Sequence, residues 1–463
     1  MKTQKGFILI VLLLLSTAFL SLLYRIHLHC TSYYDLGIYS DALNRIRIGD
    51  LNPFLPGRNI RILNDHFDPI LIVFSPFTRL LSAPWVGIAV EFLSLALCWY
   101  PLKRLQTSNK IDLKTAQFCY AFILLNHATF DAIQTPFHPT TWGVFPLVCV
   151  LSFYLLNEFP KMLASLIALY CCREEFPLIG LPLSWVLFID RKRFKAFGVF
   201  ALSTIWIIFV FLIRPKVFDG HFQNYGSVLL QTLFSDPLGV ILDNFNIGSA
   251  RMFVDRSLPV LLLASLTGLT KNWRLAFRVL LIASPILLIR FASNHWGFHY
   301  GTAAIISLLF IVLPCFGENI PRWRWAISAI FLAVTFISQP IKVFANQNKR
   351  CPNAPQRLEQ IQWAQNRLAS SAYLNLILEN NLASTQFFKF REGKNIFLLG
   401  NPAGMSTSTF DAILVEKPDS GDPWPLEYRD IKTLIDRLRA DSGVRVVADN
   451  EYIFMAEGKI SIK

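Results

Sequence analysis

Apolar blocks of roughly 15–20 residues recur along the chain as far as about residue 340, and short polar segments separate them. The first block, residues 6–24, is almost wholly apolar and is long enough to cross a bilayer as one helix. Only helices and closed barrels satisfy every backbone polar group within lipid, so these blocks predict a polytopic helical membrane protein. We expect about eleven crossings, near residues 6–24, 84–102, 116–130, 142–157, 161–173, 176–189, 196–213, 257–270, 278–291, 301–316 and 325–340.

Basic residues between the apolar blocks predict the orientation of the helices. Lys2 and Lys5 precede the first block, which places the N-terminus in the cytoplasm and residues 25–83 outside as a first outer loop. The apolar run 69–82 is broken by Pro76, and we expect it to lie along the outer surface rather than to cross. The strongly basic connections then all fall on the cytoplasmic side, at residues 103–114, 191–195, 271–278 and 322–324.

The composition changes abruptly near residue 345, after the last apolar block. Helical patterns over residues 358–378 and 428–440 accompany short β-type runs, at 395–399, 412–416, 444–448 and 452–456. We therefore predict a transmembrane domain over residues 1–344 and a small soluble α/β domain over residues 345–463. An odd number of crossings places this second domain outside the cytoplasm, where it would act as a lid, an acceptor platform or an assembly surface.

Composition and charge narrow the class of protein. Of the 463 residues, 53% are hydrophobic and 16% are charged, whereas about a quarter of a typical soluble protein is charged. A net charge of +13 would also suit nucleic-acid binding, but the basic residues cluster between apolar blocks as those of cytoplasmic loops do. We therefore expect contact with membrane lipids and no nucleic-acid partner. The eight cysteines show no spacing typical of a metal site.

Acidic residues of the first outer loop are the first candidates for chemistry. Asp35 follows the first helix by about ten residues, close to the membrane surface, where a carboxylate is costly to desolvate. It could deprotonate or orient an acceptor hydroxyl, or it could only cap a helix that begins at Leu36. Asp65 with its neighbour His66, and Asp68, are equally consistent with capping the surface helix and with a functional site.

Two later outer segments contain further polar candidates. His138 lies in a short polar and aromatic loop at residues 131–139. Arg173, Glu174 and Glu175 stand between two apolar runs. These three charges form either a tight outer turn or a group that projects into a wet cavity and is paired there, and we favour the cavity.

Basic and aromatic residues of the outer segments would suit a lipid phosphate and a stacked sugar. Arg290, His295 and His299 form one such set in the late part of the chain, and Arg58 and Arg61 of the first outer loop are rival phosphate ligands. In this topology all eight histidines fall on the outer side. That distribution favours a cleft on the outer face that binds phosphate or moves protons.

Five of these segments resemble a family of predicted multipass bacterial membrane proteins known mainly as a domain of unknown function. The family usually has His-Phe-Ser-Pro at the second segment and Lys-Glu-Asp at the fourth. The similarity covers nearly the whole chain. The matching segments are Tyr34-Asp35-Leu36-Gly37-Ile38-Tyr39 with Ala42-Leu43, His66-Phe67-Asp68-Pro69-Ile70, Phe137-His138-Pro139, Arg173-Glu174-Glu175 and His299-Tyr300.

That family in turn looks like the GT-C superfamily of integral membrane glycosyltransferases, which take sugars from polyprenyl phosphates. In those enzymes an acidic residue of the first outer loop is catalytic, and Asp35 occupies that place. The resemblance implies a bacterial inner-membrane enzyme that moves a sugar from a polyprenyl-phosphate donor to an extracytoplasmic glycan, lipid or protein acceptor. A divalent metal shared by carboxylates and phosphate is compatible with this function, although no ligand spacing indicates one.

Two other classes of protein compete with an enzyme. A transporter or lipid flippase would place charged residues along its helices toward the cytoplasmic side. A non-catalytic scaffold would act through the C-terminal domain. The polar residues singled out above gather at the outer ends of the helices, which favours an enzyme over a conduit.

Overall fold

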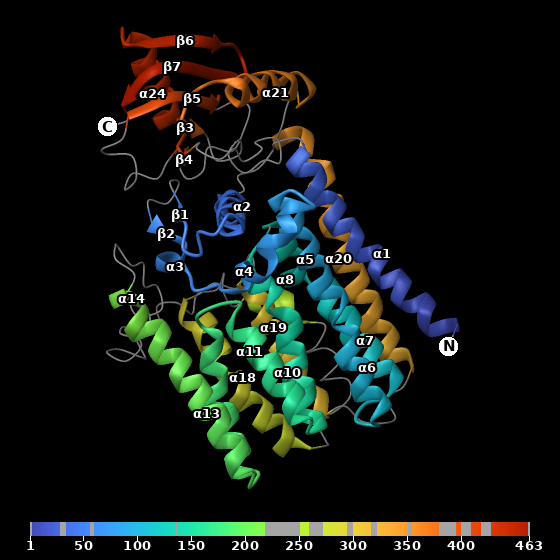
Figure 1. Cartoon of the computed structure of the whole chain (residues 1–463). Coiled ribbons are helices and arrows are strands. Elements are labelled where there is room, and N and C mark those ends of the chain that lie inside the picture. The colour runs from blue at the N-terminus through green and yellow to red at the C-terminus, as the bar shows by residue number, and fades with distance from the viewer. Residues whose placement is uncertain are drawn as a thin grey trace. The chain divides into compact units, whose positions relative to one another are not determined.

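The chain packs as two compact units. The first comprises Met1–Ala18, Leu63–Ile70 and Ala89–Pro340, and the second comprises Phe19–Ile62, Leu71–Ile88 and Ile341–Lys463. The computed structural model (Figure 1) describes residues 2–27, 34–55, 60–135, 137–217, 251–258, 272–293, 300–315, 322–350, 354–378, 395–399, 409–417 and 427–461.

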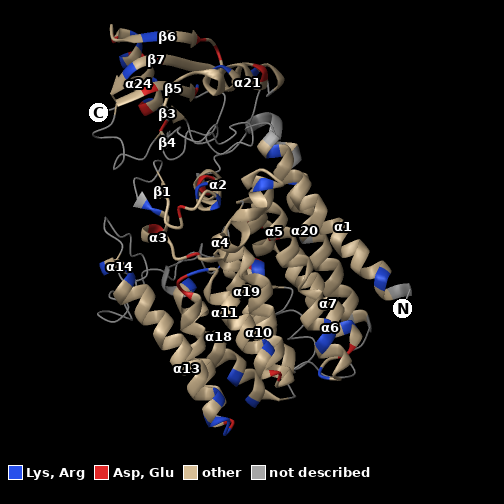
Figure 2. Ribbon diagram, viewed as in Figure 1, with Lys and Arg blue, Asp and Glu red and all other residues tan. Residues whose placement is uncertain are grey.

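Helices make up the first unit, as the apolar blocks predict. The middles of α10, α13 and α20 carry no Lys, Arg, Asp or Glu (Figure 2). In chain order the helices are α1 (Lys2–His27), α5 (Ala83–Ala96), α6 (Trp99–Thr107), α7 (Leu113–Leu125), α8 (His127–Gln134), α9 (Pro139–Trp142), α10 (Val144–Leu156), α11 (Phe159–Tyr170), α12 (Gly180–Ile189), α13 (Arg193–Ile208), α14 (Arg214–Val217), α18 (Trp273–Ser293), α19 (Gly301–Val312) and α20 (Arg322–Arg350), and α1, α5 and α20 extend into the second unit.

Within the described residues, five helical segments are long and apolar enough to cross a membrane, and each coincides with a predicted crossing. They are Gln4–Ile26, Ala83–Thr107, Pro139–Leu156, Arg193–Val217 and Trp325–Val343. Three shorter apolar helices correspond to three more predicted crossings, at Phe159–Tyr170, Phe176–Ile189 and Gly301–Val312. Most of the predicted crossing 257–270 lies outside the described residues. The count of eleven therefore stays a prediction.

The predicted crossing at 116–130 is broken at Asn126, which caps two helices at once. Its Nδ2 donates to the carbonyl of Phe122 near the end of α7 at 2.7 Å, and its Oδ1 accepts from the N–H of Thr129 at 3.0 Å. The side chain is buried. It therefore satisfies backbone groups that the ends of α7 and α8 would otherwise leave without partners.

The segment between α1 and α5 is irregular and belongs mostly to the second unit. Its elements are α2 (Tyr34–Arg47), the antiparallel pair β1 (Phe54–Leu55) and β2 (Ile60–Arg61), α3 (Ile62–Asp65), α4 (Ile70–Phe74) and a 3₁₀ helix (Ser75–Arg79). Pro76 stands in the first turn of the 3₁₀ helix. The apolar helix Ile70–Arg79 is thus too short to cross a bilayer, which agrees with its predicted role as a surface helix.

The C-terminal part contains a five-stranded mixed sheet in the order β4-β3-β5-β7-β6. β3 (Asn375–Leu378) pairs in parallel with β4 (Asn395–Leu398) and β5 (Thr409–Glu416), and β7 (Ile453–Ser461) runs antiparallel to β5 and to β6 (Val444–Asp449). Helix α21 (Ala354–Ser370) covers one face and α24 (Tyr428–Ala440) covers the other. The small C-terminal α/β part is thus as predicted.

One element of this part was predicted wrongly. The pattern over 358–378 predicts a single helix, but α21 ends at Ser370 and residues Asn375–Leu378 form the parallel strand β3. Leu376 and Leu378 contact the side of the sheet under α21, whereas Ile377 contacts the side under α24. This alternation with a period of two is that of a strand buried on both faces.

Candidate functional site

Three consecutive charges, Arg173, Glu174 and Glu175, lie in the turn between α11 and the 3₁₀ helix Phe176–Ile179. Arg173 is 4% exposed, and the side chains of Glu174 and Glu175 are 16% and 19% exposed. Charges buried to this extent are stable only when they are paired and hydrogen-bonded. The three residues are therefore an internal charged group rather than a solvated surface turn.

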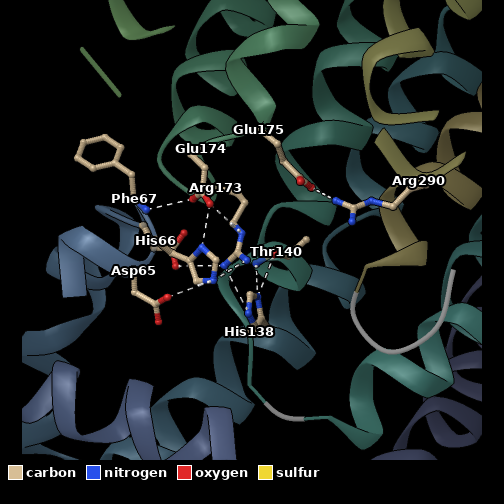
Figure 3. Close-up of polar contacts among 10 residues, drawn as sticks. Asp65, His66, Phe67, His138, Thr140, Arg173, Glu174, Glu175 and Arg290 are labelled. Carbon is tan, nitrogen blue, oxygen red and sulfur yellow. Dashed lines mark hydrogen bonds and ion pairs between the residues drawn. The ribbon is translucent and has the colours of Figure 1, made fainter. Parts of the chain in front are cut away.

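Glu174 holds the segment 63–70 against this turn (Figure 3). Its Oε1 lies 2.8 Å from Nδ1 of His66, and its Oε2 accepts the backbone N–H of Phe67 at 3.0 Å. The N–H of Ile70 also donates to the carbonyl of Cys171 at 2.9 Å. One carboxylate thus orients an imidazole and fixes the backbone next to it.

Arg173 lies on the other side of the same imidazole. Its Nη2 is 2.9 Å from Nε2 of His66, and its Nη1 is 3.4 Å from Nε2 of His138 and 3.6 Å from Oδ2 of the buried Asp68. A guanidinium can only donate hydrogen bonds, so Nε2 of His66 accepts one from Arg173. Nδ1 therefore carries the ring proton and donates a hydrogen bond to Glu174. This tautomer is assigned from its partners.

His138 reaches the cluster because it begins helix α9. Its Nδ1 accepts the backbone N–H of Thr140 at 3.3 Å and lies 2.9 Å from the hydroxyl of Thr140. Pro139 follows at the first helical position, where its missing N–H costs nothing. The His-Pro-Thr sequence therefore fixes the ring at the start of the turn, facing Arg173.

A second guanidinium, that of Arg214, enters the cluster from α14. The five residues Phe209–Ile213 form a π-helical turn between α13 and α14, and such turns often occur at functional sites. Arg214 is buried, lies 5.7 Å from the centre of the Phe67 ring and interacts electrostatically with Glu174, Asp68 and Asp65. Sequence reasoning missed this residue, for which the signal was one Arg at the end of a long apolar run.

The cluster therefore combines three carboxylates, two guanidiniums and the imidazole of His66. Burial alone would raise the pKa of Glu174, but His66, Arg173 and Arg214 outweigh it and hold that pKa well below the usual range. For His66, burial and Arg173 lower the pKa, yet Glu174 and Asp65 outweigh them and the pKa is raised. Asp65 Oδ1 lies 3.9 Å from Nε2, which is within ion-pair range but too long for a hydrogen bond.

Glu175 forms a separate pair that is linked to the first cluster. It forms an ion pair with Arg290 of α18, whose guanidinium carbon lies 5.2 Å from the centre of the Tyr300 ring. That ring is 6.4 Å from the ring of His138. A continuous series of charged and aromatic groups thus connects Arg290 with Arg173.

Another ion pair joins Asp131 of α8 to Arg256, in the helical stretch 251–258. Nε2 of His127, one turn earlier on α8, is 3.5 Å from the other oxygen of Asp131. Sequence reasoning did not single out this group. The signal available was the spacing of four residues between His127 and Asp131, which places both on one face of a helix.

The remaining predicted residues lie in other parts of the chain. Asp35 lies in the first turn of α2, which begins at Tyr34, so Asp35 does not precede the helix as a cap would. Arg61 ends β2, and its Nη1 donates to the carbonyl of Asn52 at 2.7 Å. Arg58, His295 and His299 lie outside the described residues. Within the described part of the chain, no three His, Cys, Asp or Glu residues are arranged to hold a metal ion.

Comparison with known proteins places the chain in a family. The family model described as "Predicted membrane protein (DUF2079)" matches residues 25–389. The chain belongs to this family. The matched region includes the segments of Asp35, His66, His138 and Arg173. None of the curated protein sequences matches the chain.

The fold is similar to that of a solved membrane protein. The crystal structure of ArnT from Cupriavidus metallidurans, bound to undecaprenyl phosphate, matches with a TM-score of 0.57. The match covers 96% of this chain and 97% of ArnT at 12% sequence identity. This DUF2079 protein therefore has a GT-C-like polytopic fold, as its resemblance to that superfamily predicts.

Proposed function

We propose that this chain is an integral membrane glycosyltransferase that moves a sugar from a polyprenyl-phosphate donor to an extracytoplasmic acceptor. The observation that carries the proposal is the fold, which follows that of an undecaprenyl-phosphate-bound protein over nearly its whole length. The buried network of His66, Arg173 and Glu174 supports it, because ionised groups set among apolar helices usually serve function. The enzyme would lie in a bacterial inner membrane.

The proposed reaction is a displacement at the anomeric carbon of the sugar. The acceptor hydroxyl oxygen bonds to this carbon, and the bond from the carbon to the carrier phosphate breaks. The hydroxyl proton passes to Asp35, and the electron pair of the broken bond leaves with the polyprenyl phosphate. A glycan, a lipid or a protein would supply the hydroxyl.

The negative charge that develops on the leaving phosphate must be stabilised for the reaction to be fast. For this task we propose Arg290 with His295 and His299, and Arg58 and Arg61 as a second set. Arg290 is already paired with Glu175, so binding of a phosphate would exchange one anionic partner for another. The cluster of His66 and Glu174 would hold the residues around it in place.

A reconstituted assay tests the reaction. The purified protein is placed in liposomes with undecaprenyl-phosphate-linked, radiolabelled sugars and with acceptors extracted from bacterial envelopes. We expect label to move to an acceptor and undecaprenyl phosphate to be released. Movement of intact donor across the bilayer without cleavage would instead identify a flippase and overturn the proposal.

Asp35→Asn tests the catalytic carboxylate. Asn keeps the shape and removes the base, so transfer should fall at least ~100-fold while expression and membrane insertion stay normal. The matched control is Asp41→Asn on the same helix, where Asp41 pairs with Arg45 at 2.9 Å and is assigned no role in transfer. Wild-type turnover in Asp35→Asn would refute the assignment.

A further inference from the structure

A buried carboxyl group lies inside a helix that is long and apolar enough to cross a membrane. Glu91 is on α5, in the span Ala83–Thr107, and is the only charged residue between positions 84 and 102. Its side chain is 0% exposed, and among the described residues neither carboxyl oxygen has a partner that meets hydrogen-bond geometry.

The neighbour of Glu91 is a buried threonine hydroxyl. Thr141 of α9 interacts with the Glu91 carboxyl, and its buried Oγ1 has no other hydrogen-bond partner among the described residues. One turn along α5, Ser94 donates to the Trp142 carbonyl at 2.9 Å and accepts the Phe145 N–H at 3.2 Å. Ser94 therefore holds α5 against the break between α9 and α10, which fixes the distance between Glu91 and Thr141.

Other titratable groups on the elements around α5 have partners of their own. The Cys98 thiol donates to the Ser94 carbonyl, the Tyr120 hydroxyl of α7 donates to the Ala96 carbonyl, and Cys149 of α10 lies beside Cys98. Among the described residues, no Lys, Arg or His forms an ion pair with Glu91. An ionised carboxylate in such a place costs several kcal/mol or more unless a positive charge accompanies it.

The geometry points to an intramembrane site for one small monovalent cation, a proton or Na⁺, formed by the Glu91 carboxyl and the Thr141 hydroxyl. This site goes beyond the proposed transfer reaction. The two ions suit the same oxygen ligands, because each supplies the single positive charge that the buried carboxyl lacks. A bound cation would tie α5 to α9, and His138 is the N-cap residue of α9.

Thermal unfolding of the purified full-length protein in detergent tests the site without an activity assay. The probe is Na⁺, with choline at equal ionic strength as the comparison, and each series is run from acid to alkaline pH. A ligand that binds only the folded state stabilises it by an amount that grows with the logarithm of the ligand concentration relative to its Kd. In choline, the wild-type Tm should therefore fall by several degrees as the pH rises. If Na⁺ prevents that fall, the cation is Na⁺, and if it does not, the cation is a proton.

Three variants decide whether Glu91 is responsible. Glu91→Gln keeps the volume and removes the charge, so its Tm should lose the Na⁺ dependence and should fall less than that of the wild type as the pH rises. Thr141→Val should shift the Na⁺ or H⁺ concentration at half-effect by about tenfold, and it gives a second test should Glu91→Gln not fold. Ser152→Ala on α10 removes another buried hydroxyl that has no hydrogen-bond partner among the described residues, and it should respond as the wild type does. Equal pH and Na⁺ profiles for the wild type and a folded Glu91→Gln would overturn the inference.

Discussion

At the scale of single residues, the two carboxylate oxygens of Glu174 make two different structural contacts. One oxygen orients the His66 imidazole and the other holds the Phe67 backbone, so the residue ties a segment near the N-terminus to a turn more than a hundred positions later. Removing one member of a buried charged group leaves the others unpaired, which costs more than the pair itself contributes. Stability should therefore be sensitive to this side chain.

Truncating Glu174 or Glu175 to alanine should strongly reduce stability. Glu174→Ala leaves Arg173 and Arg214 short of one negative charge, and we expect a loss of about 3–5 kcal/mol in the free energy of unfolding. Glu175→Ala should have a similar effect through Arg290. The measurement is thermal unfolding in detergent, with Glu359→Ala at an exposed position as the control, which should change stability by no more than ~0.5 kcal/mol. Tm values equal to that of the wild type for both variants would contradict the buried pairing.

The shifted pKa values predict how the cluster depends on pH. A lowered pKa makes Glu174 stabilising above its ordinary value of 4.5, and this contribution is lost as the pH falls through the folded-state value. A raised pKa makes His66 stabilising below 6.5, and this contribution is lost as the pH rises through the folded-state value. The two contributions are therefore complete together between pH 4.5 and 6.5.

The test compares the wild type with the double variant His66→Gln/Glu174→Gln, which lacks both titrations. The difference in Tm between them should be largest between about pH 4.5 and 6.5 and should shrink on either side. A difference that stays constant over the whole range would show that these two groups do not titrate as the geometry requires.

At the scale of elements, the crossing of α12 and α13 depends on one glycine. A Cβ on Gly180 would stand 1.9 Å from Ser203 Oγ and 2.0 Å from the Tyr170 hydroxyl, which bond to each other at 2.6 Å. Gly180→Ala should therefore destabilise the protein by about 1–3 kcal/mol through overpacking. Gly198→Ala on α13 is the matched control, because nothing lies within 4 Å of that position, and it should be neutral or stabilise by up to ~1 kcal/mol. A Tm for Gly180→Ala equal to that of Gly198→Ala would contradict this close approach.

The elements also show what the sequence could and could not predict. Long apolar runs such as 6–24 and 196–213 predicted their helices well, because a helix is the structure that satisfies the backbone in lipid. The strand at 375–378 was missed, since four apolar-rich residues after a helix have no period that separates them from its continuation. The break at Asn126 was missed too, because its cap depends on tertiary burial.

The sequence predicted individual residues of the site, but not their arrangement in one cluster. His66, His138, Arg173 and Glu174 were singled out as polar residues at the ends of apolar blocks, and the structure brings them together. Arg214 and Glu91 were overlooked, because a single charged residue at the end of a helix or within one can have a purely structural role. Only their burial distinguishes them.

At the scale of the whole molecule, the fold is shared with ArnT at an identity of 12%, so the architecture rests on the order and spacing of apolar blocks rather than on particular side chains. Orientation in the membrane depends on a different property, the placement of Lys and Arg between the blocks. Architecture and orientation can therefore be tested separately.

The last prediction concerns orientation in the membrane. We expect the C-terminal domain to lie outside the cytoplasm. We expect Lys2 and Lys5 to keep the N-terminus inside, and an odd number of crossings would then put residues 345–463 outside. Alkaline phosphatase, which folds only outside, should be active when fused after Lys463, and a fluorescent protein that matures only in the cytoplasm should stay dark there. Fusions after Lys110, in a basic connection, are the control and should give the opposite pattern. A bright, phosphatase-negative fusion after Lys463 would require an even number of crossings and would remove the C-terminal domain from any role near an outer site.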